Sequence, residues 1–173
     1  KYSVKSVRHS YYFFRWNKDL FNLYGTMNSI WSSIKHLGGL DNDSFIKNTP
    51  KDGIVDRIQV VQYPADTGYI EPHQHDPINQ RLIISVYMSR KSKDYNNGGT
   101  YFFNKENKAI EVEDSIEIGD VGIFYGSLKH AVSPVTINSN NKLNKKISGR
   151  WWIGLYSPET DHVINRHTSN PTK

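Results

Sequence analysis

The sequence of 173 residues contains no cysteine. Disulfides and thiolate metal sites are therefore excluded, and any metal ion must be held by histidine and carboxylate side chains. The absence of cysteine also suits a cytoplasmic protein, which is the location we expect. No apolar run approaches the roughly 20 residues that a membrane helix needs, so no membrane partner is expected.

Apolar residues are also scarce, at 36% of the chain, whereas aromatic residues reach 13%. Aromatic rings bury large areas, and the length suffices for one hydrophobic core, so we predict a single domain over residues 1–173. The net charge of +5 comes from lysines that are mostly spread along the chain. We therefore expect a solvated basic surface and a small-molecule substrate rather than a macromolecule, with nucleic acid left open by the charge.

Apolar residues recur at helical spacing between Leu20 and Ile34. This periodicity predicts one amphipathic helix, capped near Asn17 and ending near Gly38, whose apolar stripe packs on the rest of the domain. The aromatic and basic stretch before the helix is expected to be an extended lead-in. Together the two make up residues 1–39.

Beyond a polar loop, residues 40–55, the pattern changes to short apolar stretches separated by turn residues. This change predicts an α+β, mainly β fold, with a jelly-roll barrel over about residues 56–156 and a polar surface tail over 157–173. A polar turn is expected at Asn96–Gly99. The predicted strands are Arg57–Tyr63, the segment holding His73 and His75, Arg81–Met88, Thr100–Phe103, Ala109–Val112, Val121–Tyr125, Ala131–Val135 and Arg150–Tyr156.

The segment around His73 and His75 carries the clearest chemical signal. Side chains two apart in a strand project from the same face, so the two imidazoles would point into one small volume. Asp76 stands beside them, and His130 follows a later strand. Histidine pairs of this kind also occur on exposed edge strands without a metal. The third histidine favours a metal site of the Fe(II) type, with three protein ligands and open positions.

Arg150 opens the last predicted strand and shares a face with Trp152 and Tyr156. If this face looks into the barrel, the guanidinium is buried and needs an anionic partner, for which its planar fork fits a carboxylate. Arg81 is a second candidate, although its position is more typical of a charge at a strand edge. Strand tyrosines such as Tyr87 could line a pocket, but they are more often core residues.

Five short motifs occur in an order that resembles the 2-oxoglutarate- and Fe(II)-dependent oxygenase family, with its double-stranded β-helix core. The resemblance covers roughly residues 56–156. Each motif alone is weakly specific, and their order and spacing carry the likeness. The matching pieces are Pro72–Asp76, Gly98–Phe102, Gly119–Phe124, His130–Val135 and Gly149–Trp152.

The resemblance implies Fe(II) and 2-oxoglutarate as cofactors and gives roles to individual residues. His73 matches the first metal histidine, His130 the distal one, and Arg150 the partner of the far carboxylate of 2-oxoglutarate. Tyr63 stands where the family often has a residue that touches the cosubstrate or the substrate. This chain departs from the family pattern at the carboxylate ligand of the metal.

The family has an acid two residues after the first histidine, where this chain has His75, and Asp76 comes one residue later. Strand geometry favours His75 as the third ligand. The family pattern and the charge that a carboxylate gives to Fe(II) favour Asp76, brought inward by a bulge.

The implied function is a non-haem dioxygenase that uses O₂ to oxidise, usually to hydroxylate, a substrate. One alternative is a cupin-like three-histidine metalloenzyme that does not use 2-oxoglutarate, and another is a non-catalytic β-barrel that binds a ligand. The substrate carries no readable motif. Its specificity is expected to come from the N-terminal segment, the loops 40–55 and 138–149, and the tail.

Overall fold

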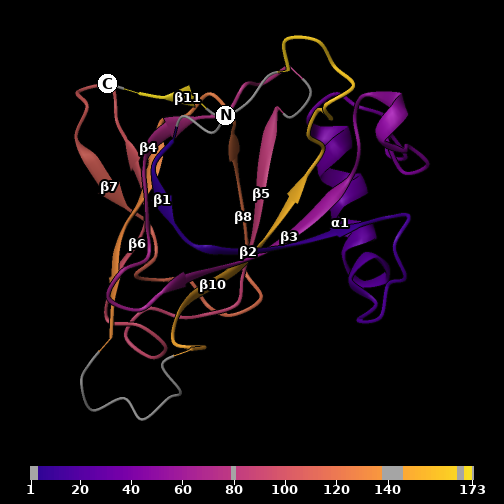
Figure 1. Cartoon of the computed structure of the whole chain (residues 1–173). Helices are drawn as coiled ribbons and strands as arrows, with labels where there is room; N and C mark the ends of the chain where they lie inside the picture. Colours follow the sequence, from indigo (N-terminus) through magenta and orange to yellow (C-terminus); the bar gives the residue numbers. More distant parts are fainter. Residues whose placement is uncertain (1–3, 79–80, 138–145, 167–169, 173) are drawn as a thin grey trace.

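The computed structural model describes residues 4–78, 81–137, 146–166 and 170–172. Two antiparallel sheets face each other, and one helix lies beside them (Figure 1). The five-stranded sheet runs in the order β2 (His9–Phe14), β3 (Arg57–Pro64), β10 (Gly149–Tyr156), β5 (Leu82–Tyr87), β8 (Val121–Tyr125). The six-stranded sheet runs β1 (Ser6–Val7), β4 (Tyr69–Gln74), β9 (His130–Thr136), β6 (Asn97–Phe103), β7 (Ala109–Glu111), with β11 (Asn170–Pro171) also paired to β4.

From β3 onward the chain crosses repeatedly between the sheets. β3, β5, β8 and β10 belong to the five-stranded sheet, and β4, β6, β7 and β9 to the other. Apart from β6 and β7, which pair with each other, strands that follow one another in sequence lie in opposite sheets, as in a jelly roll. The prediction of a mainly β protein with one helix is confirmed, and the two packed sheets agree with the jelly-roll expectation.

The helix α1 (Leu23–Leu37) begins three residues later than the apolar periodicity. Asn22, the residue before it, has a left-handed conformation and no side-chain capping bond. Asp19 takes over this role, because its carboxylate accepts the N–H groups of Leu23 at 2.8 Å and Tyr24 at 2.9 Å. A carboxylate at this end also interacts favourably with the helix dipole. The helix ends at Gly38.

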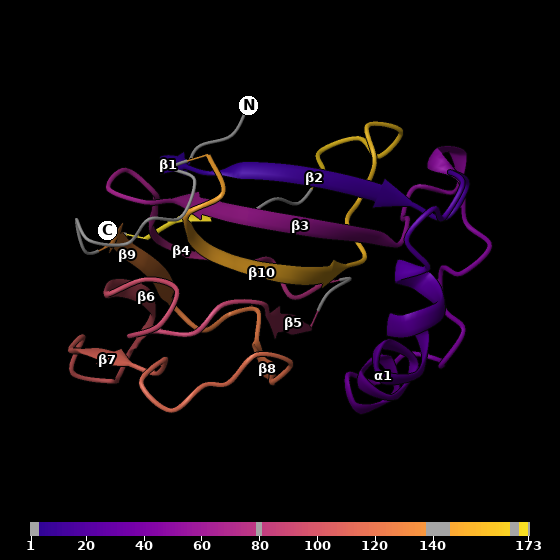
Figure 2. The same ribbon diagram turned by 90° about the horizontal axis from the view of Figure 1, so that it is seen from below.

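Strand alternation divides the core into two layers. On β3, Val61 and Tyr63 face the other sheet, whereas Ile58 faces α1. The helix contributes Trp31 and Ile34 to the second layer, where they cluster with apolar residues of β5 and β10. Figure 2 shows α1 at one end of the five-stranded sheet, away from the six-stranded one. The space between the sheets is thus left to a separate set of side chains.

The sheets reach beyond the predicted core. The expected lead-in forms β1 and β2, and β11 lies in the expected tail. The predicted turn at Asn96–Gly99 is wrong, since β6 starts at Asn97. Gly98 and Gly99 have positive φ values of 97° and 115°, and the register shifts there. Glycine within a strand often marks a bulge, so a glycine pair does not by itself indicate a turn.

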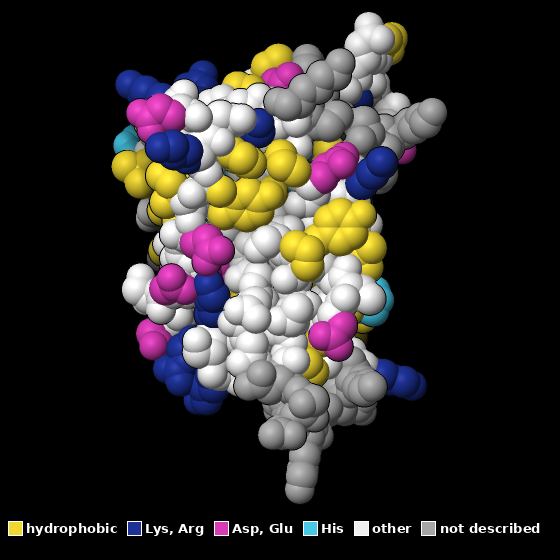
Figure 3. Space-filling view, turned by 90° about the vertical axis from the view of Figure 1, so that its left-hand side faces the viewer, with side chains coloured by type: hydrophobic (Ala, Val, Ile, Leu, Met, Phe, Trp, Pro, Cys, Tyr) yellow, Lys and Arg dark blue, Asp and Glu magenta, His cyan; other side chains and the backbone are white. Residues whose placement is uncertain are grey.

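The loop 40–55 contains one short 3₁₀ helix, η1 (Pro50–Asp52). Most of the loop 138–149 lies outside the described residues. No helix in the described part of the chain is long and apolar enough to cross a membrane. On the face shown in Figure 3, basic and acidic side chains are interspersed with hydrophobic ones.

Candidate metal centre and its cavity

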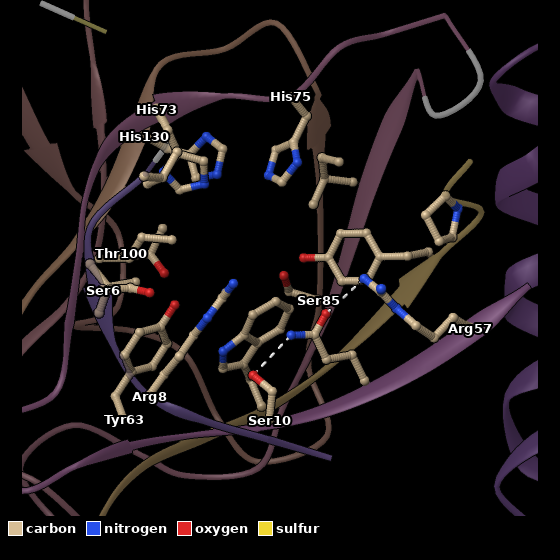
Figure 4. Close-up of a pocket in the computed structure, with 18 of the residues that line it drawn as sticks. Ser6, Arg8, Ser10, Arg57, Tyr63, His73, His75, Ser85, Thr100 and His130 are labelled. Carbon is tan, nitrogen blue, oxygen red and sulfur yellow. Dashed lines mark hydrogen bonds between the residues drawn. The ribbon is translucent and has the colours of Figure 1, made fainter. Parts of the chain in front are cut away.

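A cavity of about 870 Å³ is lined by residues of both sheets. The five-stranded sheet presents the alternate residues of β3 and β10 to it, so the face that Arg150 shares with Trp152 and Tyr156 does look inward. Tyr63 and Tyr87 line the same cavity. Figure 4 shows polar groups projecting into it from opposite sides.

The histidines His73, His75 and His130 meet at this cavity. One nitrogen of each lies within 4.8 Å of the others, and the ring centroids are 4.3 to 5.1 Å apart. Two strands create this arrangement, because β4 and β9 are antiparallel neighbours in which His73 faces His130. His75 follows immediately after the end of β4. The sequence therefore predicted three side chains that the fold brings together.

Backbone carbonyls fix two of these rings. His73 Nδ1 lies 2.9 Å from the carbonyl oxygen of Glu71, and His130 Nδ1 lies 2.8 Å from that of Leu128. Because a carbonyl only accepts, each Nδ1 carries the proton, and Nε2 keeps its lone pair for a metal.

Burial holds all three histidines in the neutral form. It lowers the pKa of His130 to about 3, and it lowers the pKa of His73 and, more strongly, of His75. Neutral imidazoles are the form that binds a metal. Three nitrogen donors grouped at a cavity fit Fe(II), whose oxygenase sites use three protein ligands and leave open positions.

Asp76 also lines the cavity, but it is not a member of the ligand group. Its Oδ1 accepts the N–H of Ile78 at 3.1 Å, as in an Asx turn. β4 does contain a register shift, but this lies upstream, between Ile70 and His73. The geometry therefore brings His75, and not Asp76, to the other two histidines.

Arg150 is engaged by an acid that the sequence analysis did not identify. Its Nε lies 2.9 and 2.7 Å from the two carboxylate oxygens of Glu113, and both side chains are 2–3% exposed. Glu113 also accepts the hydroxyl of Tyr95 and the N–H of Thr100. Gly99 makes room, because a Cβ there would lie 2.6 Å from Glu113 Oε2. The anionic partner required by Arg150 is thus supplied by the chain itself.

One donor of Arg150 remains unused. Nε and Nη2 bind Glu113, and Nη2 also donates to Thr100 Oγ1 at 2.9 Å, but Nη1 is buried without an acceptor among the described residues. The guanidinium carbon lies 5.6 Å from the ring centres of Tyr63 and Tyr87. Trp152 on the same strand likewise has a buried indole N–H without a partner in the described structure.

Another arginine that lines the cavity, Arg8, was also missed. It lies between β1 and β2, and Ser6, Ser10 and Tyr12 share its side of the chain and line the cavity with it. Figure 4 shows its side chain extending into the cavity beside Tyr63. The alternation of these four residues was visible in the sequence, but they are too polar to stand out as a strand.

Arg81, the other cationic candidate, lies elsewhere. Its Nη1 donates to the carbonyl of Gly38 at the end of α1, at 3.1 Å. A cationic side chain at this end of a helix is a common structural arrangement. It does not line the histidine cavity, in line with its lower rank in the sequence analysis.

No protein-family model matches the chain, and no curated protein matches it. Solved structures do. A Pseudomonas putida prolyl-4-hydroxylase is 12% identical, with a TM-score of 0.57, over 88% of this chain and 72% of that one. IDO from Bacillus thuringiensis is also 12% identical, with a TM-score of 0.50, over 98% of this chain and 78% of that one.

A third structure, a full-length Neurospora crassa protein in complex with alpha-KG, is 16% identical with a TM-score of 0.44. The match covers 88% of this chain and 55% of the Neurospora protein, so the chain spans little more than half of that protein's length. The first two matches establish a common fold. This chain therefore shares the fold of a prolyl-4-hydroxylase and of IDO.

Proposed function

We propose that this protein is an Fe(II)- and 2-oxoglutarate-dependent dioxygenase that oxidises a small molecule, with hydroxylation as the expected outcome. The observation that carries the proposal is the cluster of His73, His75 and His130 at the cavity between the two sheets. The fold shared with a prolyl-4-hydroxylase supports this class of reaction.

His73, His75 and His130 would hold the metal through their cavity-facing nitrogens. Fe(II) with bound 2-oxoglutarate supplies the activation of O₂ that oxidises a C–H bond. The part of the chain is to keep the imidazoles neutral and oriented, which the carbonyls of Glu71 and Leu128 do for two of them. The remaining wall of the cavity would place the substrate beside the metal.

For the cosubstrate, we propose that Arg150 and Tyr63 face the far carboxylate of 2-oxoglutarate. Both line the cavity, and the unused Nη1 of Arg150 gains an acceptor if a carboxylate binds there. A buried donor without an acceptor carries a desolvation penalty that such a ligand removes.

One observation favours a second candidate, a three-histidine metalloenzyme that does not use 2-oxoglutarate. Glu113 already neutralises Arg150, so the family's signature arginine is not by itself proof of a cosubstrate site. The three neutral histidines also depart from the family's two histidines and one acid. Metal-dependent turnover without 2-oxoglutarate would establish this alternative.

The deciding experiment is an anaerobic titration of Fe(II) into metal-free protein with 2-oxoglutarate present. The weak visible charge-transfer band of the chelate and the bound metal are both followed. We expect one equivalent of Fe(II) and the band in the wild type, loss of both in His75→Ala, and retention of both in the matched variant Asp76→Ala.

Loss of the band in Asp76→Ala with retention in His75→Ala would instead make Asp76 the third ligand. One bound equivalent of metal without a band, and without release of CO₂ from 2-oxoglutarate, would refute the cosubstrate and leave the second candidate. Protein that binds no metal would refute both.

A further inference from the structure

Arg8 is a cation at the cavity without a carboxylate partner in the described part of the chain. The ion pairs there involve Arg15, Arg90, Arg150 and Arg166, each with its own acid, but not Arg8. Its guanidinium lies beside the Tyr63 hydroxyl (Figure 4). A cation that is half-buried needs compensation, and phenol groups supply hydrogen bonds but no negative charge at neutral pH.

An arginine guanidinium is effectively always protonated, so Arg8 brings a positive charge to the cavity. Arg8 lines the same cavity as His73 and His75, so its charge lies on the wall of the cavity that holds the histidine cluster.

Arg150 cannot provide the same charge. All three of its carboxylate contacts go to one acid, Glu113, and both side chains are buried. The pair has no net charge. Its Nη1, which has no acceptor among the described residues, can therefore donate a hydrogen bond but adds no net positive charge. A carboxylate that binds beside it would bring an uncompensated charge into a site of low dielectric. Arg8 lines the same cavity and can supply positive charge, whereas Arg57, which lines it too, donates to Gln59 and stacks on Tyr12.

The unused hydrogen-bonding groups in this cavity are donors. Nη1 of Arg150 and Nε1 of Trp152 are buried without acceptors among the described residues. Together with Arg8 they present N–H groups from β10 and from the N-terminal segment. This set matches a ligand that is rich in acceptors and negatively charged.

We propose that Arg8 is the anion-binding residue of the cavity, pairing with a carboxylate of the bound molecule that the Arg150–Glu113 pair cannot balance. The carboxylate belongs either to 2-oxoglutarate or to an acidic substrate, and this pair of sources rests on the proposed function. The N-terminal segment would thereby complete a site whose other parts lie on the jelly roll.

The first arm of the test measures cosubstrate discrimination by the metal-loaded protein without oxygen. Dissociation constants are compared for 2-oxoglutarate and for 2-oxopentanoate, which has the same chelating end but lacks the far carboxylate. If Arg8 binds that carboxylate, Arg8→Gln weakens 2-oxoglutarate roughly tenfold to a hundredfold, as expected for a half-buried charged pair. The affinity for 2-oxopentanoate stays unchanged.

The second arm probes the substrate source. With metal and saturating 2-oxoglutarate bound, glutarate serves as a simple acidic probe, and its binding is measured by calorimetry. If Arg8 binds the acid of a substrate, Arg8→Gln leaves cosubstrate discrimination intact and abolishes glutarate binding. Arg8→Lys, which keeps the charge, retains most of the affected affinity in either arm, whereas a merely structural role would not distinguish lysine from glutamine.

Lys18→Gln is the matched control, because it removes one positive charge from an exposed position on the same segment. Unchanged binding of both 2-oxoglutarate and glutarate in Arg8→Gln would overturn the proposal. If the wild type binds metal but no 2-oxoglutarate, the proposed function fails, and the glutarate arm on the metal-loaded protein still decides the role of Arg8. Glutarate binding that depends on Arg8 supports it, and binding that is absent or independent of Arg8 overturns it.

Discussion

Glu113→Gln is the perturbation that most directly tests how the cavity is held together. The change removes one charge and keeps the shape, so Arg150 stays buried at 2% exposure without a counter-ion. Breaking a buried pair in this way costs about 3–5 kcal/mol. Glutamine can still accept the N–H of Thr100, which favours the lower end, about 3 kcal/mol. A domain of this size then loses roughly 6–12 °C in Tm.

The assay is urea and thermal unfolding followed by circular dichroism, with Arg150→Met and the double variant Arg150→Met/Glu113→Gln beside the single one. Removing the stranded cation should restore part of the stability, so we expect the two changes to be non-additive by about 2 kcal/mol or more. Additive effects, within about 0.5 kcal/mol, would refute the coupled pair. They would mean that Arg150 is compensated by another group.

The same variant has a pH signature. Burial raises the pKa of Glu113, but Arg150 and the hydrogen bonds from Tyr95 and Thr100 outweigh this and hold it below its usual value. A depressed folded-state pKa contributes stability above the unfolded pKa of about 4.3, and this stability is lost as the pH falls through the folded value. Glu113→Gln should lack this component of acid unfolding while keeping the rest.

Three further predictions follow from single contacts. The buried Lys35 ammonium lies 2.8 Å from the Asp56 carboxylate, and Asp56→Ala leaves it without a counter-ion. This change should lower the free energy of unfolding in urea by about 3–5 kcal/mol, whereas Asp52→Ala, at an exposed acid, should not. Gly149→Ala places a Cβ 2.1 Å from the Tyr63 carbonyl oxygen at a φ of 124°, and a loss below about 1 kcal/mol would contradict this strain. Burial lowers the pKa of His130 to about 3, so metal-free protein should lose stability as the pH falls below about 6.5, where unfolded chains take up protons first; a flat profile there would count against it.

Much of the strand pattern could be predicted from the sequence because its signals are local. Arg57–Tyr63 is rich in β-branched residues and is followed by a proline, and β3 is observed at Arg57–Pro64. β2 carries no comparable signal. It is a strand because its residues pair with β3 from His9 to Phe14, and this pairing joins segments about fifty residues apart. Such pairing is decided by tertiary contacts, which no short window contains.

The site, too, could be predicted only where its sequence signals are local. The spacing of His73 and His75 predicted a shared face, but the position of His130 opposite His73 depends on β4 and β9 being neighbours. Glu113 gave no sign at all. It follows β7, and it reaches Arg150 because Gly99 has no side chain in its path.

The assignment of Arg150 by sequence assumed that a buried arginine facing a cavity awaits an anionic ligand. In this chain Glu113 satisfies the charge, so a bound acid must be balanced by another cation. Arg8 can take this role only while the N-terminal segment stays paired to β3. Arg15, just after β2, helps to secure that pairing through its ion pair with Asp56, next to the start of β3. A substitution at Asp56 should therefore reduce carboxylate binding in the cavity while the jelly roll remains folded. The reason is that the segment is an edge strand and the histidines lie on the other sheet.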